Sequence, residues 1–274
     1  MENAPQTGSP HHSFSGEWPS YEPTAEGLAI PPAIPRHGDQ GDRGQPQVAP
    51  AVPQALSLAL TRESGARGST IARRVGERLG WQVYDQELLE YMTQAPVVRG
   101  SLLDSLPDAC RDWLQQRLAE LERTTLRPLQ EEDYRGENAV VRDLVRVILA
   151  LGAQGKVVLI GRGAGCVLPR WSTVNVRIVA PLEDRIAYLS QQDRLSASEA
   201  IEKVRANDQR RRHFVSHHFG RSLDEVHNYD LVLNSSLLGA EGCVELIVRA
   251  IELRSASREQ ASFSPRVTRA THET

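Results

Sequence analysis

Short apolar runs alternate with helical patterns throughout the middle of this chain. The predicted strands are 55–61, 81–85, 156–161, 174–180 and 229–236, and most of them are rich in Val, Ile and Leu. Helical spacing of apolar residues follows these strands, for example at Ile71, Val75 and Leu79. The same spacing at Leu114, Leu118 and Leu121 predicts a helix within 96–137. Strands that are apolar on both faces and separated by helices are typical of a parallel sheet. The sequence therefore predicts an α/β fold with a central parallel sheet and helices on both of its faces.

The composition changes sharply near residue 54. Ten of the 16 prolines lie within the first 53 residues, among Gly, Ser, Gln and His. Such a segment buries too little apolar area to offset the entropy of ordering it, so we predict a disordered Pro-rich arm over 1–53. The polar, aperiodic stretch 255–274 is likewise predicted to be a disordered tail. One folded domain is expected between them, over 54–254.

Bulk properties restrict the class of partner. A net charge of −3 gives no general attraction to nucleic acid or to an anionic membrane. Cys110, Cys166 and Cys243 are far apart and match neither a disulfide framework nor a paired zinc spacing. The first residues lack a secretory signal, and no apolar run approaches a bilayer span. We expect a cytoplasmic protein without nucleic-acid or membrane partners, and the oligomeric state stays open.

The loop after the first apolar run has the features of a phosphate cradle. In the stretch TRESGARGST (61–70), Gly65 and Gly68 allow a tight turn that brings backbone N–H groups close to an anion. A helix beginning near Ser69 adds its positive end, and Thr70 offers a hydroxyl to a phosphate-bound Mg²⁺. The Lys of a complete Walker A loop is absent. Taken alone, this loop is equally explained as an ordinary turn with helix-capping residues.

Other strand ends carry residues of the same kind. Asp85 is the last residue of the predicted strand 81–85, and Arg162 and Gly163 directly follow the predicted strand 156–161. Because ligands of open α/β sheets bind at the carboxyl ends of strands, these residues are expected near the first loop. Turns alone would not require arginine there, so an anionic ligand is indicated.

A basic helix provides a further candidate segment. Helical spacing from Ile201 places Val204, Asp208 and Arg211 on one face, with Arg212 close by. An apolar face that continues into Asp and Arg indicates a helix whose end reaches an anionic site. A solvated basic run is the alternative for this segment alone.

Taken in order, these segments resemble the cytidylate kinase-like family of P-loop nucleoside monophosphate kinases. The matching segments are TRESGARGSTIA, GWQVYDQELL, VVLIGRGAGCVL, VRIVAPLEDRI, NDQRR and NYDLVLNSSLLG. The resemblance extends over about 56–251, nearly the whole predicted domain. It implies a three-layer P-loop kinase fold that uses ATP and Mg²⁺ and takes small-molecule nucleotides as substrates.

The resemblance also implies roles for individual residues. The ATP phosphates would bind at Gly65, Ala66, Arg67, Gly68, Ser69 and Thr70, and Thr70 would contact Mg²⁺ through the nucleotide. The acceptor would bind at Asp85, Arg162 and Gly163. A lid, the segment that closes over the bound nucleotides, would carry Arg210, Arg211 and Arg212, which clamp the transferring phosphoryl group. Asp208 would orient this lid, and these four residues would be the catalytic ones. Arginine suits this role because its planar fork binds phosphate oxygens in pairs.

The sequence departs from well-characterised cytidylate kinases at several positions. Gly68 aligns with their loop Lys, as is common in the cytidylate kinase-like subgroup, and Arg67 either replaces that charge or obstructs the phosphate path. Gln86 stands where these kinases have a CMP-binding Ser, and Glu90 and Tyr91 fall where they have an Arg. Two functions are therefore expected. One is ATP-dependent phosphorylation of a CMP-like or dCMP-like nucleotide or a related small acceptor, and the alternative is a catalytically weak nucleotide-binding protein that kept the fold.

Overall fold

The computed structural model describes residues 52–53, 55–126 and 136–263. The predicted arm, apart from residues 52 and 53, and the tail beyond residue 263 lie outside the described residues.

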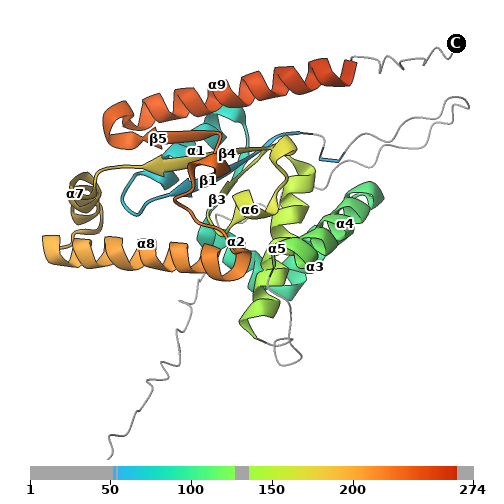
Figure 1. Ribbon diagram of the computed structural model, residues 1–274, viewed down its shortest axis with the longest axis horizontal. Helices are drawn as coiled ribbons and strands as arrows, with labels where there is room; N and C mark the ends of the chain where they lie inside the picture. Colours follow the sequence, from blue (N-terminus) through green and yellow to red (C-terminus); the bar gives the residue numbers. More distant parts are fainter. Residues whose placement is uncertain (1–51, 54, 127–135, 264–274) are drawn as a thin grey trace, which may run out of the picture. The chain divides into compact units, whose positions relative to one another are not determined.

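A parallel five-stranded sheet in the order β2-β3-β1-β4-β5 forms the centre of the fold (Figure 1). Its strands are β1 (Ser57–Arg62), β2 (Gln82–Tyr84), β3 (Val157–Ile160), β4 (Thr173–Val179) and β5 (Leu231–Asn234). The central strand is β1, in which Leu58 pairs with Val158 of β3 and with Val174 of β4. Because every pairing is parallel, the carboxyl ends of the strands share one edge of the sheet, as predicted.

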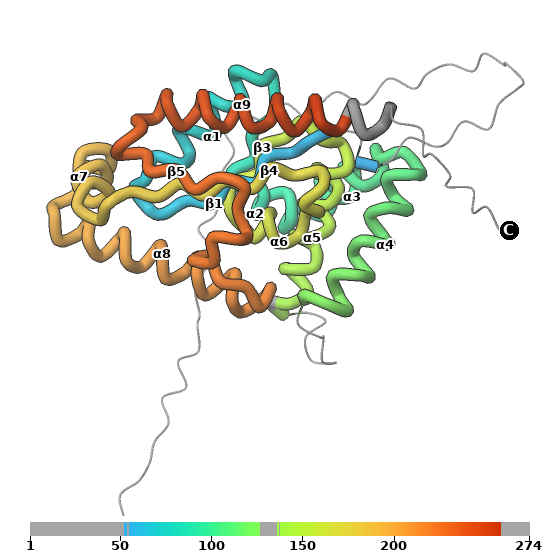
Figure 2. The backbone as a smooth tube through the Cα atoms, turned by 45° about the horizontal axis from the view of Figure 1, so that its top comes forward, coloured from blue at the N-terminus to red at the C-terminus, as the bar shows by residue number. Residues whose placement is uncertain are grey.

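One face of the sheet is covered by α1 (Gly68–Leu79) and α9 (Ser235–Phe263) (Figure 2). Ile71, Val75 and Ile247 from these helices are fully buried in one apolar cluster with alternate residues of β1, β3 and β4. The predicted helical spacing of Ile71 and Val75 thus marks the face that packs on the sheet.

The other face is covered by a second group of helices. These are α2 (Gln86–Gln94), α3 (Pro96–Asp104), α4 (Asp108–Thr124), α5 (Glu137–Gln154) and the short α6 (Ala164–Val167). Their cluster contains Ala59 of β1 and Leu159 of β3, and it buries the predicted α4 positions Leu114, Leu118 and Leu121. Helices on both faces confirm the predicted α/β class with a central parallel sheet.

Two further helices connect β4 to β5. They are α7 (Leu182–Asp193) and α8 (Ala197–Phe219), which pack against each other. Ser196 and Glu199 form a capping box at the start of α8, in which each side chain accepts a hydrogen bond from the backbone N–H of the other residue. Short 3₁₀ helices, Arg170–Ser172 and Val226–Asn228, precede β4 and β5.

The closing helix α9 is longer than its apolar pattern predicts. It bends at Gly239, which has a φ of 68°, and continues to Phe263, so the predicted boundary at residue 254 falls within it. Near its end, Arg258 donates a hydrogen bond of 2.9 Å to the carbonyl of Pro53 and lies over the ring of Trp171. These tertiary contacts extend the helix through a segment that has no apolar periodicity of its own.

Candidate active site

The loop between β1 and α1 is shaped by residues in left-handed backbone conformation. Gly65 has a φ of 83°, and a Cβ at this position would lie 2.5 Å from the carbonyl oxygen of Arg185. Arg67, at the N-cap of α1, has a φ of 58°. The first turn of α1 has no side-chain cap and no acidic residue. Its N–H groups lack intrahelical acceptors, so this end of the helix suits an anion.

Gly65→Ala should destabilise the protein more than the control Gly80→Ala. Gly80 also has a positive φ, of 67°, but no atom lies within 4 Å of a Cβ added there. Both variants strain the backbone, whereas only Gly65→Ala forces a methyl group against the backbone of Arg185. We expect an additional loss of about 1–3 kcal/mol in the free energy of unfolding. Urea denaturation of both variants measures the difference. Equal losses would show that the loop does not need this close approach.

A buried ion pair holds the loop against α7 and α8. The Asp208 carboxylate, on α8, accepts the Ser64 N–H at 2.7 Å and the Arg185 Nη1–H at 2.6 Å. Arg185, on α7, also donates to the Ser64 carbonyl at 3.2 Å. Asp208 and Arg185 are each 8% exposed. The position of Asp208 fits the predicted role of orienting α8, since its carboxylate is occupied by the loop and by Arg185.

A second charged network braces the same loop from β4. Glu63 accepts the Ala180 N–H at 3.2 Å and lies 3.6 Å from the guanidinium of Arg177. Arg177 also pairs with Asp224 at 2.8 Å. Our sequence interpretation did not single out Glu63, Arg177 or Arg185. The available signal was Arg177 itself, the single charged residue of the predicted strand 174–180, since an arginine in a buried strand needs a charged partner.

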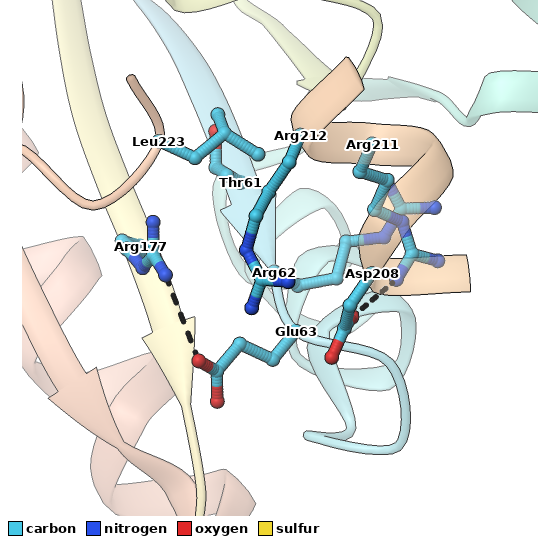
Figure 3. Close-up of a pocket in the computed structure, with 8 residues that line it drawn as sticks. All are labelled: Thr61, Arg62, Glu63, Arg177, Asp208, Arg211, Arg212 and Leu223. Atoms are coloured by element: carbon cyan, nitrogen blue, oxygen red, sulfur yellow. Dashed lines mark hydrogen bonds and ion pairs between the residues drawn. The ribbon is translucent and has the colours of Figure 1, made fainter. Parts of the chain in front are cut away.

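A pocket opens between the end of β1, β4 and α8. Figure 3 shows the residues that line it, which are Thr61, Arg62, Glu63, Arg177, Asp208, Arg211, Arg212 and Leu223. Four of these eight side chains are guanidinium groups, and two are carboxylates that pair with arginines. The pocket therefore presents excess positive charge beside the glycine loop.

The arginines at this edge repel one another. Burial, and next the guanidinium of Arg211, lowers the pKa of Arg62 to about 9. Burial, with smaller contributions from Arg211 and Arg210, lowers the pKa of Arg162 to about 10. Burial also lowers the pKa of Arg211, although Asp208 opposes this shift. All of these groups remain cationic at neutral pH, so an anion bound among them would relieve their repulsion.

The structure separates the three lid arginines. Arg211 is half-buried and lies 3.4 Å from Asp208, facing the loop. Arg212 is exposed, lines the other side of the pocket and lies 3.7 Å from Asp224. Arg210 is exposed and donates to Asn207 within α8. Consecutive helical residues point about 100° apart, so the three side chains cannot reach the same point.

The predicted acceptor residues lie at adjacent strand ends. Asp85, after β2, caps α2 by accepting the Leu88 N–H at 3.0 Å. Arg162, after β3, has a φ of 50° and contacts the Glu90 carboxylate of α2. Its guanidinium carbon also lies 5.0 Å from the centre of the Phe214 ring on α8. Each charged group thus has a structural partner in the free protein.

The remaining predicted residues occupy the two glycine turns. Gly163 is buried at the N-cap of α6 with a φ of 70°. Ala66 is buried, and its carbonyl accepts a hydrogen bond of 2.9 Å from the Ser235 hydroxyl. Ser69 and Thr70 are half-buried on the first turn of α1, beside Gly68. The metal contact of Thr70 stays a prediction.

The Arg67 side chain points away from the arginine cluster, towards α7. Its side chain is exposed, and its guanidinium carbon lies 5.1 Å from the centre of the Tyr188 ring on α7. The charge that Arg67 carries is thus engaged with an aromatic ring outside the arginine cluster.

A central parallel strand, a glycine turn and a helix N-terminus beside clustered arginines give the arrangement that α/β proteins of the P-loop class have around their phosphate site. The sequence profile of the cytidylate kinase-like family matches residues 57–237. The chain therefore belongs to this family, which confirms the resemblance inferred from its motifs.

Two relatives of this chain are named cytidylate kinase. A cytidylate kinase from Ignicoccus hospitalis is 26% identical over 194 residues, which span 71% of this chain and 98% of the relative. A cytidylate kinase from Sulfolobus acidocaldarius is 22% identical over 130 residues, 47% of this chain and 70% of the relative. Among solved structures, the shikimate kinase from Bacteroides thetaiotaomicron superposes with a TM-score of 0.38 and 14% identity, covering 72% of this chain and 98% of its own.

Within the described ranges, no helix combines the length and apolar character that a bilayer span requires.

Proposed function

We propose that the protein transfers the terminal phosphoryl group of ATP to a nucleoside monophosphate of the CMP or dCMP type, or to a related small acceptor. The observation that carries this proposal is the gathering of Arg62, Arg162 and Arg211 at the carboxyl edge of the sheet, beside the glycine loop. The relatives named cytidylate kinase support the class of acceptor.

The chemistry of phosphoryl transfer suits these residues. The reaction mainly requires in-line positioning and neutralisation of developing negative charge. The N–H groups at the start of α1 would hold the donor phosphates, with Gly65 making the turn. Arg162 would bind the acceptor phosphate, and Arg211 would contact the transferring group. Asp208 fixes the position of Arg211 relative to the loop, because it accepts hydrogen bonds from both.

The loop also fits a magnesium ion that arrives with the nucleotide. Mg²⁺ prefers oxygen ligands, keeps several waters and needs few protein groups when phosphates bind it. Thr70 offers one hydroxyl, and Ser69 offers another directly after Gly68, where a Walker A loop has its Ser or Thr. The ion would neutralise phosphate charge, and these two half-buried side chains would orient it.

A second candidate function is nucleotide binding with weak or no catalysis. The contact between Glu90 and Arg162 favours it, because this carboxylate occupies the guanidinium that an acceptor phosphate would use. An acceptor must displace Glu90 or bind beside it.

The test is a coupled ADP-release assay of the full-length protein with Mg²⁺-ATP and CMP, dCMP, UMP, AMP or GMP. We expect ADP release that depends on CMP or dCMP and exceeds a no-acceptor control. Arg211→Ala protein, purified identically, controls for contaminating kinases. ATP binding without ADP release for any acceptor would favour the second candidate.

A further inference from the structure

Arg62 and Gly68 show an exchange of residue types relative to a Walker A loop. That motif, G-x-x-x-x-G-K-[ST], begins with Gly and has Lys at its seventh position. When Gly68 is set at the Lys position, Arg62 takes the first position, and Ser69 takes the position of the Ser or Thr. The chain thus has a cation where the motif has Gly, and Gly where the motif has its cation.

The packing of these two residues shows that the exchange is reciprocal in space. A Cβ at Gly68 would lie 2.5 Å from the Cβ of Arg62 and 2.8 Å from its Cγ. The Arg62 stem therefore occupies the space where a side chain at position 68 would begin. Its Nη1 lies against Gly161, at the end of β3, where a Cβ would also collide. The side chain thus runs from β1 across the loop towards the predicted acceptor residues.

The Arg62 guanidinium lies at the junction of donor loop, lid and acceptor residues. Figure 3 shows Arg62 and Arg211 approaching each other below α8. Arg162 and Asp85 are near enough to shift the pKa of Arg62, in opposite directions. No ion pair joins Arg62 to a carboxylate within the described residues. Burial, and next Arg211 and Arg162, lower the pKa of Arg62, whereas Asp85 and Glu87 raise it. Neither carboxylate gives Arg62 the direct ion pair that Asp208 gives to Arg185 in the described part of the chain.

We propose that the Arg62 guanidinium supplies the cation that a Walker A Lys normally provides, by binding the terminal phosphates of a nucleoside triphosphate. This inference rests on the proposed nucleotide site. The small residue at position 68 is then a requirement of the mechanism, since it lets the Arg62 stem cross the loop. Arg67 does not take this role, because its side chain lies over Tyr188.

The binding test uses two probes, Mg²⁺-ATP and inorganic tripolyphosphate, titrated calorimetrically into the full-length protein. Arg62→Met should weaken both by the same factor, at least about tenfold, or about 1.4 kcal/mol. Arg62→Lys keeps the charge but loses the planar fork, so an intermediate loss is expected. Arg74→Met, which removes an exposed charge of α1 that pairs with Glu241, should leave both affinities within about twofold.

The melting temperature of the free protein separates a binding role from a structural one. Burial, and next the charge of Arg211, disfavours the charged form of Arg62 in the folded protein. Arg62→Met should therefore melt at the same temperature as wild type or higher. A merely structural arginine would instead show a lower melting temperature. Stable Arg62→Met protein with unchanged affinity for both probes would overturn the proposal, as would a loss confined to Arg67→Met.

The reciprocal exchange gives a second, independent test. Gly68→Lys alone places its stem against Arg62 and should impair binding of Mg²⁺-ATP. Arg62→Gly alone removes the cation and should impair binding as well. The double variant Arg62→Gly/Gly68→Lys rebuilds the ordinary arrangement and should bind within about tenfold of wild type, a positive coupling in a double-mutant cycle. If the binding losses of the two single variants simply added in the double variant, the side chains at positions 62 and 68 would not compete for the same space.

These measurements test the role of Arg62 separately from the proposed kinase activity. If no acceptor yields ADP but Mg²⁺-ATP binding depends on Arg62, the inference stands and the kinase activity does not. If ADP is released with CMP while Arg62→Met binds and turns over like wild type, the activity stands and the inference is wrong.

Discussion

Asp208→Ala should lower the free energy of unfolding by about 3–5 kcal/mol, because the buried Arg185 guanidinium loses its nearer carboxylate, at 2.6 Å, and keeps only Glu63, at 3.5 Å. The substitution also removes the acceptor of the Ser64 N–H, so the loop loses its attachment to α8. Urea denaturation of the full-length protein measures the loss. We further expect weaker binding of Mg²⁺-ATP, since the loop and Arg211 lose their common anchor.

Asp193→Ala is the matched control, because it removes one carboxylate from a more exposed pair with Lys203. Ion pairs near the surface contribute about 0–1 kcal/mol, so this variant should remain close to wild type. If Asp208→Ala and Asp193→Ala lost the same free energy of unfolding, Asp208 would not be the residue that holds the loop to α7 and α8. Arg185→Met/Asp208→Leu should be less destabilised than Asp208→Ala, since removing both charges leaves no unpaired one.

Arg211→Ala should reduce kcat for the acceptor found in the ADP-release assay by about 10²–10³. Its effect on the Kd of Mg²⁺-ATP should be no more than about threefold, since the contact is strongest in the transition state. The structural basis is the half-buried position of Arg211 between Asp208 and the glycine loop. Single-turnover rates and calorimetric ATP binding separate these two quantities.

Arg205→Ala provides the control on the same helix, because Arg205 is exposed and does not line the pocket. It should retain wild-type kcat. Arg210→Ala and Arg212→Ala should show smaller losses than Arg211→Ala, because both side chains are more exposed. A matching loss of kcat and ATP affinity in Arg211→Ala would show a ground-state phosphate ligand and contradict the lid role.

Periodicity predicted the elements with a strong amphipathic or apolar pattern and missed those without one. The buried positions Leu114, Leu118 and Leu121 identified α4 correctly. By contrast, α3 begins at Pro96, has Val97 81% exposed and buries only Leu102. Its weak pattern gave no helical signal. Such elements form because neighbouring helices supply contacts that the local sequence does not encode.

The candidate site was predicted in its loops but not in its charge pairing. The glycine loop, Asp208 and Arg211 were identified from motif order and helical spacing. Arg62 was overlooked as a ligand because it belongs to the end of an apolar strand, and Arg67 was the candidate for the missing Lys charge. The crossing of the Arg62 stem over Gly68 and the position of Arg67 over the Tyr188 ring distinguish these two arginines.

The sequence by itself determined the α/β class, the family and the loops proposed here for phosphate binding, because periodicity and turn chemistry are local properties of a chain. The tertiary structure decided which charges meet. Asp208 pairs with Arg185, Glu90 contacts Arg162, and Arg62 lies near Arg211 and Arg162. The physical reason is that electrostatic energies depend on distances between segments far apart in sequence and on their burial, neither of which a local pattern contains.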